Sequence, residues 1–149
     1  MTRAPHGAAE IVAAFGSLDT PDFEAKYIVP FRLPYPLLYA GRRVVRARCH
    51  RAIVGNFVAA FEAIKAAGLK DHARNYSGIY AKRNQRGGLK PSTHSWGIAI
   101  DLEAEKFPLR STKRQHPGVI EAFAKARFHY GGDFAERPDP MHFQFATGY

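Results

Sequence analysis

Apolar residues recur at helical spacing in three parts of the chain. Over residues 51–67 they line one face of a predicted helix, at positions Val54, Phe57, Val58, Phe61 and Ile64. This spacing predicts a helix with one buried stripe, and Gly68 is expected to end it, because glycine readily takes the left-handed conformation found past helix ends. A shorter helix is expected over residues 8–15, closed by Gly16, and another from Pro117, since proline is favoured in the first turn.

Two short segments, residues 97–102 and 141–145, alternate with a period of two, which predicts β-strands. In the first, the isoleucine and leucine side chains share one face and Asp101 lies on the other. In the second, the methionine and phenylalanine side chains share one face, opposite His142 and Gln144. Each strand is therefore expected to turn large apolar groups one way and a potential metal ligand the other.

Residues 20–41 are rich in proline and aromatic residues, which favours an extended wrapping segment over a helix. No repeat or linker divides the 149 residues, so we expect one domain. The composition, with 46% hydrophobic and 13% aromatic residues, is that of a globular protein and excludes a disordered one.

The net charge of +9 favours an anionic partner without saying which. The single cysteine, Cys49, excludes a disulfide scaffold and a cysteine-rich zinc site. A helix needs about 20 consecutive apolar residues to span a bilayer, and no apolar run in the chain is that long, so no membrane span is expected. The first 18 residues lack the apolar core of a signal peptide because Glu10 interrupts it, and we expect synthesis in the cytoplasm.

Two histidines and two carboxylates occur in and beside the predicted strands. If these strands are neighbours, His94, Asp101 and His142 converge, and two imidazoles with one carboxylate are a common ligand set for catalytic zinc. One Zn²⁺ per chain is therefore expected; it would lower the pKa of bound water to about 7. A general base is still needed, and Asp139, three residues before His142 and flanked by two prolines, is well placed.

The block Ser-x-His-x-x-Gly-x-Ala-x-Asp (residues 92–101), followed by Asp-x-x-His-Phe-Gln (139–144), resembles the zinc peptidoglycan peptidases of the D-alanyl-D-alanine carboxypeptidase (VanY-like) family. The Gly-Gly-Asp-aromatic run at residues 131–134 is similar to the branch of phage L-alanyl-D-glutamate endopeptidase endolysins. The resemblance implies an α+β fold like that of Hedgehog domains and DD-peptidases, with a small antiparallel sheet and packed helices around zinc. It covers about residues 44–145, which suggests a catalytic core over 44–149 after a wrapping segment over about 1–43.

The same resemblance implies roles for individual residues. The zinc ligands would be His94, Asp101 and His142, and Asp139 would be the catalytic base. An upstream arginine would bind substrate and stabilise the oxyanion; Arg83 is the candidate and Arg86 its rival. Further substrate or ligand-orienting positions are Ser92, Trp96, His129 and Gln144, of which Trp96 fits a core position equally well.

The implied substrate is a peptidoglycan stem peptide, which the enzyme would reach in the cell wall after release from the cytoplasm. The sequence leaves the scissile bond within the stem peptide open. A D-alanyl-D-alanine carboxypeptidase or dipeptidase of the same fold is the alternative, and a non-catalytic basic polymer-binding module is a further one. A cluster of five arginines could bind anionic wall polymers, or it could equally be the solvent-exposed face of a strand: Arg42, Arg43, Arg46, Arg48 and Arg51. Nucleic acid is not the expected partner, because no known motif is present, and a monomer is expected.

Overall fold

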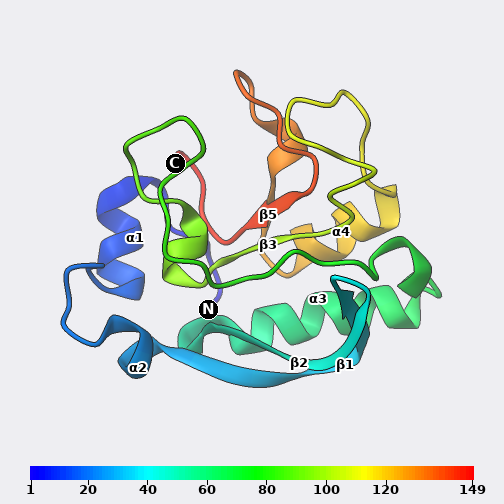
Figure 1. The fold of residues 1–149 in the computed structure, drawn as a ribbon, viewed down its shortest axis with the longest axis horizontal. Helices are drawn as coiled ribbons and strands as arrows, with labels where there is room; N and C mark the ends of the chain where they lie inside the picture. Colours follow the sequence, from blue (N-terminus) through cyan, green and yellow to red (C-terminus); the bar gives the residue numbers. More distant parts are fainter.

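Two antiparallel sheets and three longer helices form the fold in the computed structural model, which describes residues 1–149 (Figure 1). The longer helices are α1 (Gly7–Phe15), α3 (Val54–Ala66) and α4 (Pro117–Lys125), and a fourth, α2 (Phe23–Tyr27), has only five residues. The strands are β1 (Ile28–Tyr39), β2 (Arg42–His50), β3 (Ala99–Asp101), β4 (His129–Tyr130) and β5 (His142–Gln144). Short 3₁₀ turns include η3 (Thr93–Trp96) and η4 (Gly131–Asp133). The expected α+β class is confirmed.

The three predicted helices are present at the expected places. Helix α3 buries Phe57, Phe61 and Ile64 and follows a 3₁₀ turn at Arg51–Ile53, so the stripe predicted over residues 51–67 is confirmed. Gly68 takes a positive φ of 73° just past its end. Helices α1 and α4 match the other two predictions, and Gly16 follows α1 with a φ of 96°.

The proline-rich segment over residues 20–41 forms a short helix followed by a long β-strand. Residues 23–27 are helical in α2, and the following twelve residues form β1, which pairs with β2 as a two-stranded hairpin. The pairing is interrupted between Arg32 and Leu37, the stretch that holds Pro34 and Pro36. A proline lacks the N–H that a ladder needs, so it is tolerated where the pairing is irregular or on an edge. The expectation of extended chain in place of a helix therefore holds for β1 and is wrong for residues 23–27, which are helical.

Strands β3 and β5 are neighbours, which is the condition for the convergence expected from the sequence. They pair antiparallel with Ile100 opposite Phe143 and Asp101 opposite His142, and β4 pairs on the other edge of β5. Ile100 and Phe143 belong to the fully buried core. Asp101 and His142 are buried too, so both faces of this small sheet are shielded from solvent.

One hydrophobic cluster of 30 buried residues extends from Ile11 to Ala146. It includes Phe31 and Leu37 of β1 together with Phe57 of α3 and Phe143 of β5. The hairpin also spans the boundary expected near residue 43, since β1 lies before it and β2 after it. Figure 1 shows the hairpin along the lower edge, α3 above it, and the sheet of β3 and β5 beyond α3. No helix is both long and apolar enough to cross a bilayer.

Candidate metal centre

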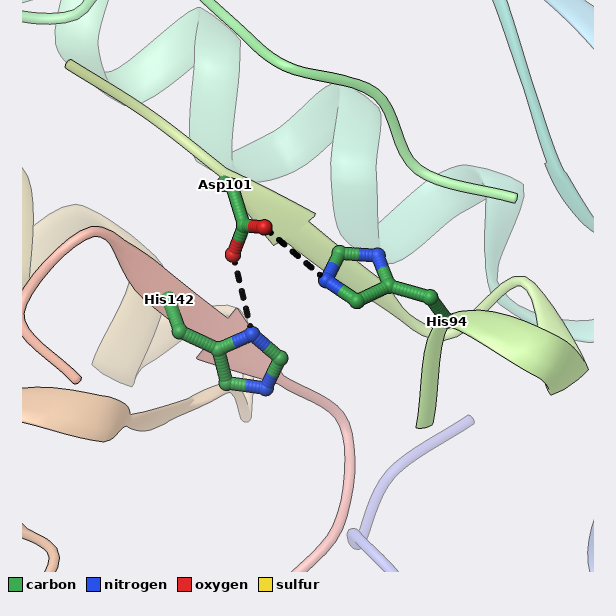
Figure 2. A group of neighbouring side chains, drawn as sticks. All are labelled: His94, Asp101 and His142. Carbon is green, nitrogen blue, oxygen red and sulfur yellow. Dashed lines mark hydrogen bonds and ion pairs between the residues drawn. The ribbon is translucent and has the colours of Figure 1, made fainter. Parts of the chain in front are cut away.

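Three buried side chains converge where β3, β5 and η3 meet. Asp101 and His142 are directly opposed across the β3–β5 ladder, and η3 brings in His94. The potential ligand atoms of these three residues all lie within 4.8 Å of one another. Figure 2 shows both imidazole rings directed at the two oxygens of the Asp101 carboxylate. The convergence predicted from the sequence is therefore present in the structure.

Local structure fixes the position and tautomer of His94. Ser92 caps η3 by accepting a hydrogen bond from the backbone N–H of His94 at 3.2 Å. The Nδ1 atom of His94 lies 2.8 Å from the carbonyl oxygen of Ile79. A carbonyl can only accept, so Nδ1 carries the hydrogen and Nε2 presents its lone pair, 3.2 Å from Oδ2 of Asp101.

His142 is held as the other tautomer, with its hydrogen on Nε2. Its Nε2 lies 2.8 Å from Oε1 of Gln144, whose amide nitrogen is used to donate to the carbonyls of Ala146 and Tyr149. The Gln144 oxygen therefore accepts, Nε2 of His142 carries the hydrogen, and Nδ1 faces Oδ1 of Asp101 at 3.0 Å. An acceptor behind each imidazole is the usual support of metal-binding histidines.

The donor set fits a divalent cation. With these tautomers, two imidazole lone pairs face the oxygens of one carboxylate, an arrangement that repels unless positive charge lies among them. The buried Nε2 of His94 has no hydrogen-bond partner. Two neutral histidines and one carboxylate are a ligand set that suits Zn²⁺ and leaves a coordination position open. His94, Asp101 and His142 are thus the residues that would hold the metal.

The electrostatics of the site favour an ionised Asp101. Burial alone would raise the pKa of this carboxyl group, but protonated imidazoles of His142 and His94, whose protons would stand where the metal binds, outweigh burial and hold its pKa well below the usual range. Asp101 therefore stays anionic and available as a ligand.

Asp139 lies in the wall of a cavity of about 650 Å³ that opens onto the metal cluster. The cavity is also lined by His94, Asp101 and His142. The Oδ1 atom of Asp139 is buried without a hydrogen-bond partner. Burial raises the pKa of Asp139, the charge of Asp101 adds to this, and His142, Arg86 and His94 oppose it. A carboxylate with a raised pKa facing the cluster has the properties of a general base.

The Gly-Gly-Asp segment shapes the loop that carries Asp139. The backbone N–H of Asp139 donates to the carbonyl of Gly131 at 2.9 Å, and the N–H of His142 donates to the carbonyl of Asp139 at 3.0 Å. A Cβ on Gly131 would collide with the carbonyl oxygen of Asp139 and with His142. Glycine is therefore required for the close approach of these two stretches.

Both candidate arginines line the cavity. The backbone of Arg83 is fixed by Ser95, whose hydroxyl donates to its carbonyl at 2.7 Å and accepts from its N–H at 3.1 Å. Arg86 is exposed, and its charge lowers the pKa of Asp139. Neither guanidinium is within ion-pair distance of a carboxylate.

Of the further positions, Ser92, His129 and Gln144 line the cavity, but Trp96 does not. The Trp96 indole is buried, donates to the carbonyl of Gly16 at 2.9 Å and packs edge-on against Tyr149. A cleft-wall role for Trp96 is therefore wrong, because this ring anchors α1 and the C-terminal segment to the core.

Other residues of the cavity were not anticipated from the sequence. Arg137 lines it with a buried Nε that has no partner, and Lys90 and Tyr149 contribute to the wall. Thr93 donates to Oε1 of Gln144 at 3.0 Å and so belongs to the support of His142. The one sequence feature that could have pointed to Arg137 as a cavity residue is its position two residues before Asp139.

Comparison with known families gives one match. Residues 86–145 match the family model described as D-alanyl-D-alanine carboxypeptidase. The matched range contains His94, Asp101, Asp139 and His142, and it excludes Arg83. No curated protein and no solved structure matches the chain significantly. The family match and the metal cluster lie in the same part of the chain, and both point to a metallopeptidase type of site.

Proposed function

We propose that the chain is a zinc-dependent peptidase that hydrolyses peptidoglycan stem peptides at the L-alanyl-D-glutamate bond, as endolysins do. The observation that carries this proposal is the pair of imidazole lone pairs directed at Asp101 on the floor of a cavity. The match to a peptidase family over the same residues supports the reaction class.

Asp139 acts as the general base in this proposal. Its carboxylate takes a proton from the attacking water and returns it to the amine of the departing peptide, so one residue serves both halves of the reaction. The unpartnered oxygen of Asp139 is the atom that would accept this proton. When bound, Zn²⁺ supplies Lewis acidity toward the scissile carbonyl and lowers the pKa of water.

The negative charge that develops on the carbonyl oxygen needs a donor. Both arginines line the cavity, and Arg83 fills this role in the proposal because its backbone is fixed to Ser95 and its side chain is the less exposed of the two. A preorganised cation near the developing charge lowers the barrier of such reactions.

A second candidate keeps the site and changes the bond. The matching family model is described as D-alanyl-D-alanine carboxypeptidase, which favours removal of a terminal D-alanine. In either case the enzyme meets its substrate in the cell wall, after release from the cytoplasm.

A digest of purified muropeptides with and without chelator tests the proposal. We expect mass spectrometry to show new L-alanine and D-glutamyl termini, and we expect chelation to abolish them and added Zn²⁺ to restore them. Loss of terminal D-alanine would instead establish the carboxypeptidase. A metal-loaded protein that cleaves neither bond would overturn the proposal and favour a non-catalytic binding module.

A further inference from the structure

A second, shallower groove lies outside the catalytic cavity. It has a volume of about 450 Å³ and shares no lining residue with that cavity. It runs between the hairpin and residues 76–80, and its walls include three tyrosines and two arginines: Tyr39, Tyr76, Tyr80, Arg46 and Arg48. We call these five residues the Tyr–Arg groove.

The surface around this groove is strongly cationic. Between Glu24 and Glu62 the sequence contains seven lysines and arginines and no acidic residue. Of the five hairpin arginines, all exposed, Arg48 alone has a carboxylate partner, Glu24 at 3.0 Å. The other four have no acidic group within ion-pair distance: Arg32, Arg42, Arg43 and Arg46.

The register of the hairpin concentrates this charge. Arg32 lies directly opposite Arg46 across the β1–β2 ladder, and both side chains are exposed. Like charges in directly opposed positions destabilise a strand pair. An anion between the two guanidinium groups would relieve this repulsion, and guanidinium forks match phosphate geometry closely.

The tyrosines add a second kind of contact. Tyr39 is 48% exposed, its ring centroid lies 5.4 Å from that of Tyr76, and Arg48 lies over the ring of Tyr80 at 5.7 Å. Such rings offer flat apolar faces with a hydroxyl at the edge, which suit the carbon skeleton of a sugar or polyol. Charge and rings together suit a polymer that alternates such units with anionic groups.

We propose that the Tyr–Arg groove with Arg32 binds a wall polymer of sugar or polyol units joined by phosphodiester groups. The identity of this polymer rests on the proposed function, because an enzyme that acts on peptidoglycan meets the polymers attached to it. In Figure 1 the hairpin runs along the edge away from the sheet of β3 and β5. Binding there would hold the enzyme on the wall while leaving the catalytic cavity free.

The test measures binding of the full chain to three probes. These are cell-wall sacculi that carry a polyol-phosphate polymer, the same sacculi after chemical removal of the polymer, and duplex DNA. We expect the double variant Arg32→Gln/Arg46→Gln to bind polymer-bearing sacculi at least about fivefold more weakly. Tyr39→Ala should also weaken binding without any change of charge.

Matched controls separate this groove from general electrostatics. Lys65→Gln/Lys113→Gln removes two exposed charges elsewhere and should leave binding within about twofold of wild type. All variants should hydrolyse a small soluble stem peptide at the wild-type rate.

Four outcomes would overturn the inference: equal binding to stripped sacculi, equal loss in the control variant, no effect of Tyr39→Ala, or tighter binding of DNA than of the polymer. A chain that binds the polymer through this groove but cleaves no stem peptide would support the groove and refute the proposed function.

Discussion

Single substitutions can separate the role of the metal ligands from that of the general base. His142 faces Asp101 at 3.0 Å, whereas the buried oxygen of Asp139 has no hydrogen-bond partner. Asp139 is thus placed to act on water rather than to hold the cation. This difference gives opposite expectations for the two residues.

We expect Asp139→Asn to retain bound metal and to lose hydrolysis by about 10²–10⁴-fold, the range typical for a general base. His142→Ala should lose the metal together with activity. Elemental analysis of the purified variants and a muropeptide rate assay measure the two effects. Near wild-type lysis by the asparagine variant would refute the assignment of the base.

Gln144 allows a test of how His142 is oriented. Gln144→Leu removes the oxygen that accepts from Nε2 of His142 at 2.8 Å, and we expect zinc affinity to fall by about 10–100-fold. Gln144→Glu keeps an oxygen at this position and serves as the control. Competition with a chromophoric chelator measures the affinity. Equal affinities for the leucine variant and wild type would show that this hydrogen bond does not orient the ring.

At the scale of elements, the connection from η3 to β3 depends on one glycine. Gly97 has a φ of 70°, and a Cβ there would lie 2.7 Å from Cδ1 of Ile28 and 2.9 Å from the backbone nitrogen of His50. That nitrogen donates to the carbonyl of Gly97 at 2.9 Å, so the two backbones are in close contact. The turn thereby links the hairpin to the element that carries His94.

We expect Gly97→Ala to lower the free energy of unfolding by about 2–4 kcal/mol, from left-handed strain plus overpacking. Gly68→Ala is the matched control, because its φ is 73° and no atom lies within 4 Å of the added Cβ. It should cost about 1–2 kcal/mol. Urea denaturation measures both. Equal losses would show that the close contact at Gly97 contributes nothing.

The sequence predicted the elements that have a clear period, and with them the metal cluster. Alternation in β3 and β5 placed Asp101 and His142 on one face, and the structure pairs them directly. The hairpin was missed because proline argues against a strand. Here Pro34 and Pro36 lie where the β1–β2 pairing is interrupted, a place where a sheet tolerates proline. Arg137 and Thr93 were missed because their positions depend on contacts between loops, which no local pattern encodes.

At the scale of the whole molecule, His50 joins three parts of the chain. It ends β2, its Nε2 donates to the carbonyl of Phe15 in α1, and its Nδ1 accepts from the N–H of Ala52. Its ring stacks on Tyr27 at 5.2 Å. Burial lowers the pKa of His50, and the hydrogen bond to Phe15 only partly offsets this.

A histidine with a lowered pKa makes stability dependent on pH. The unfolded chain binds a proton more readily at this position, so the contribution is present above about pH 6.5 and is lost as pH falls through the pKa of the folded state. We expect the free energy of unfolding of wild type to decline more steeply than that of His50→Gln between pH 7 and pH 5. The difference can reach about 1.4 kcal/mol per pH unit. Parallel curves in denaturant titrations would contradict this.

The strip from Ser77 to Ala81 lies between the Tyr–Arg groove and the metal cluster, and it serves the cluster through main-chain atoms. Its N–H and carbonyl groups bond to the backbone of Asp101 and to His94, including the ring of the latter. Because every amino acid except proline carries these atoms, substitutions at the exposed positions Ser77 and Ala81 can change the outer surface while the bonds to the cluster remain. Insertion or deletion of one residue would shift the register of all these bonds. The length of this strip is therefore more constrained than the identity of its exposed side chains.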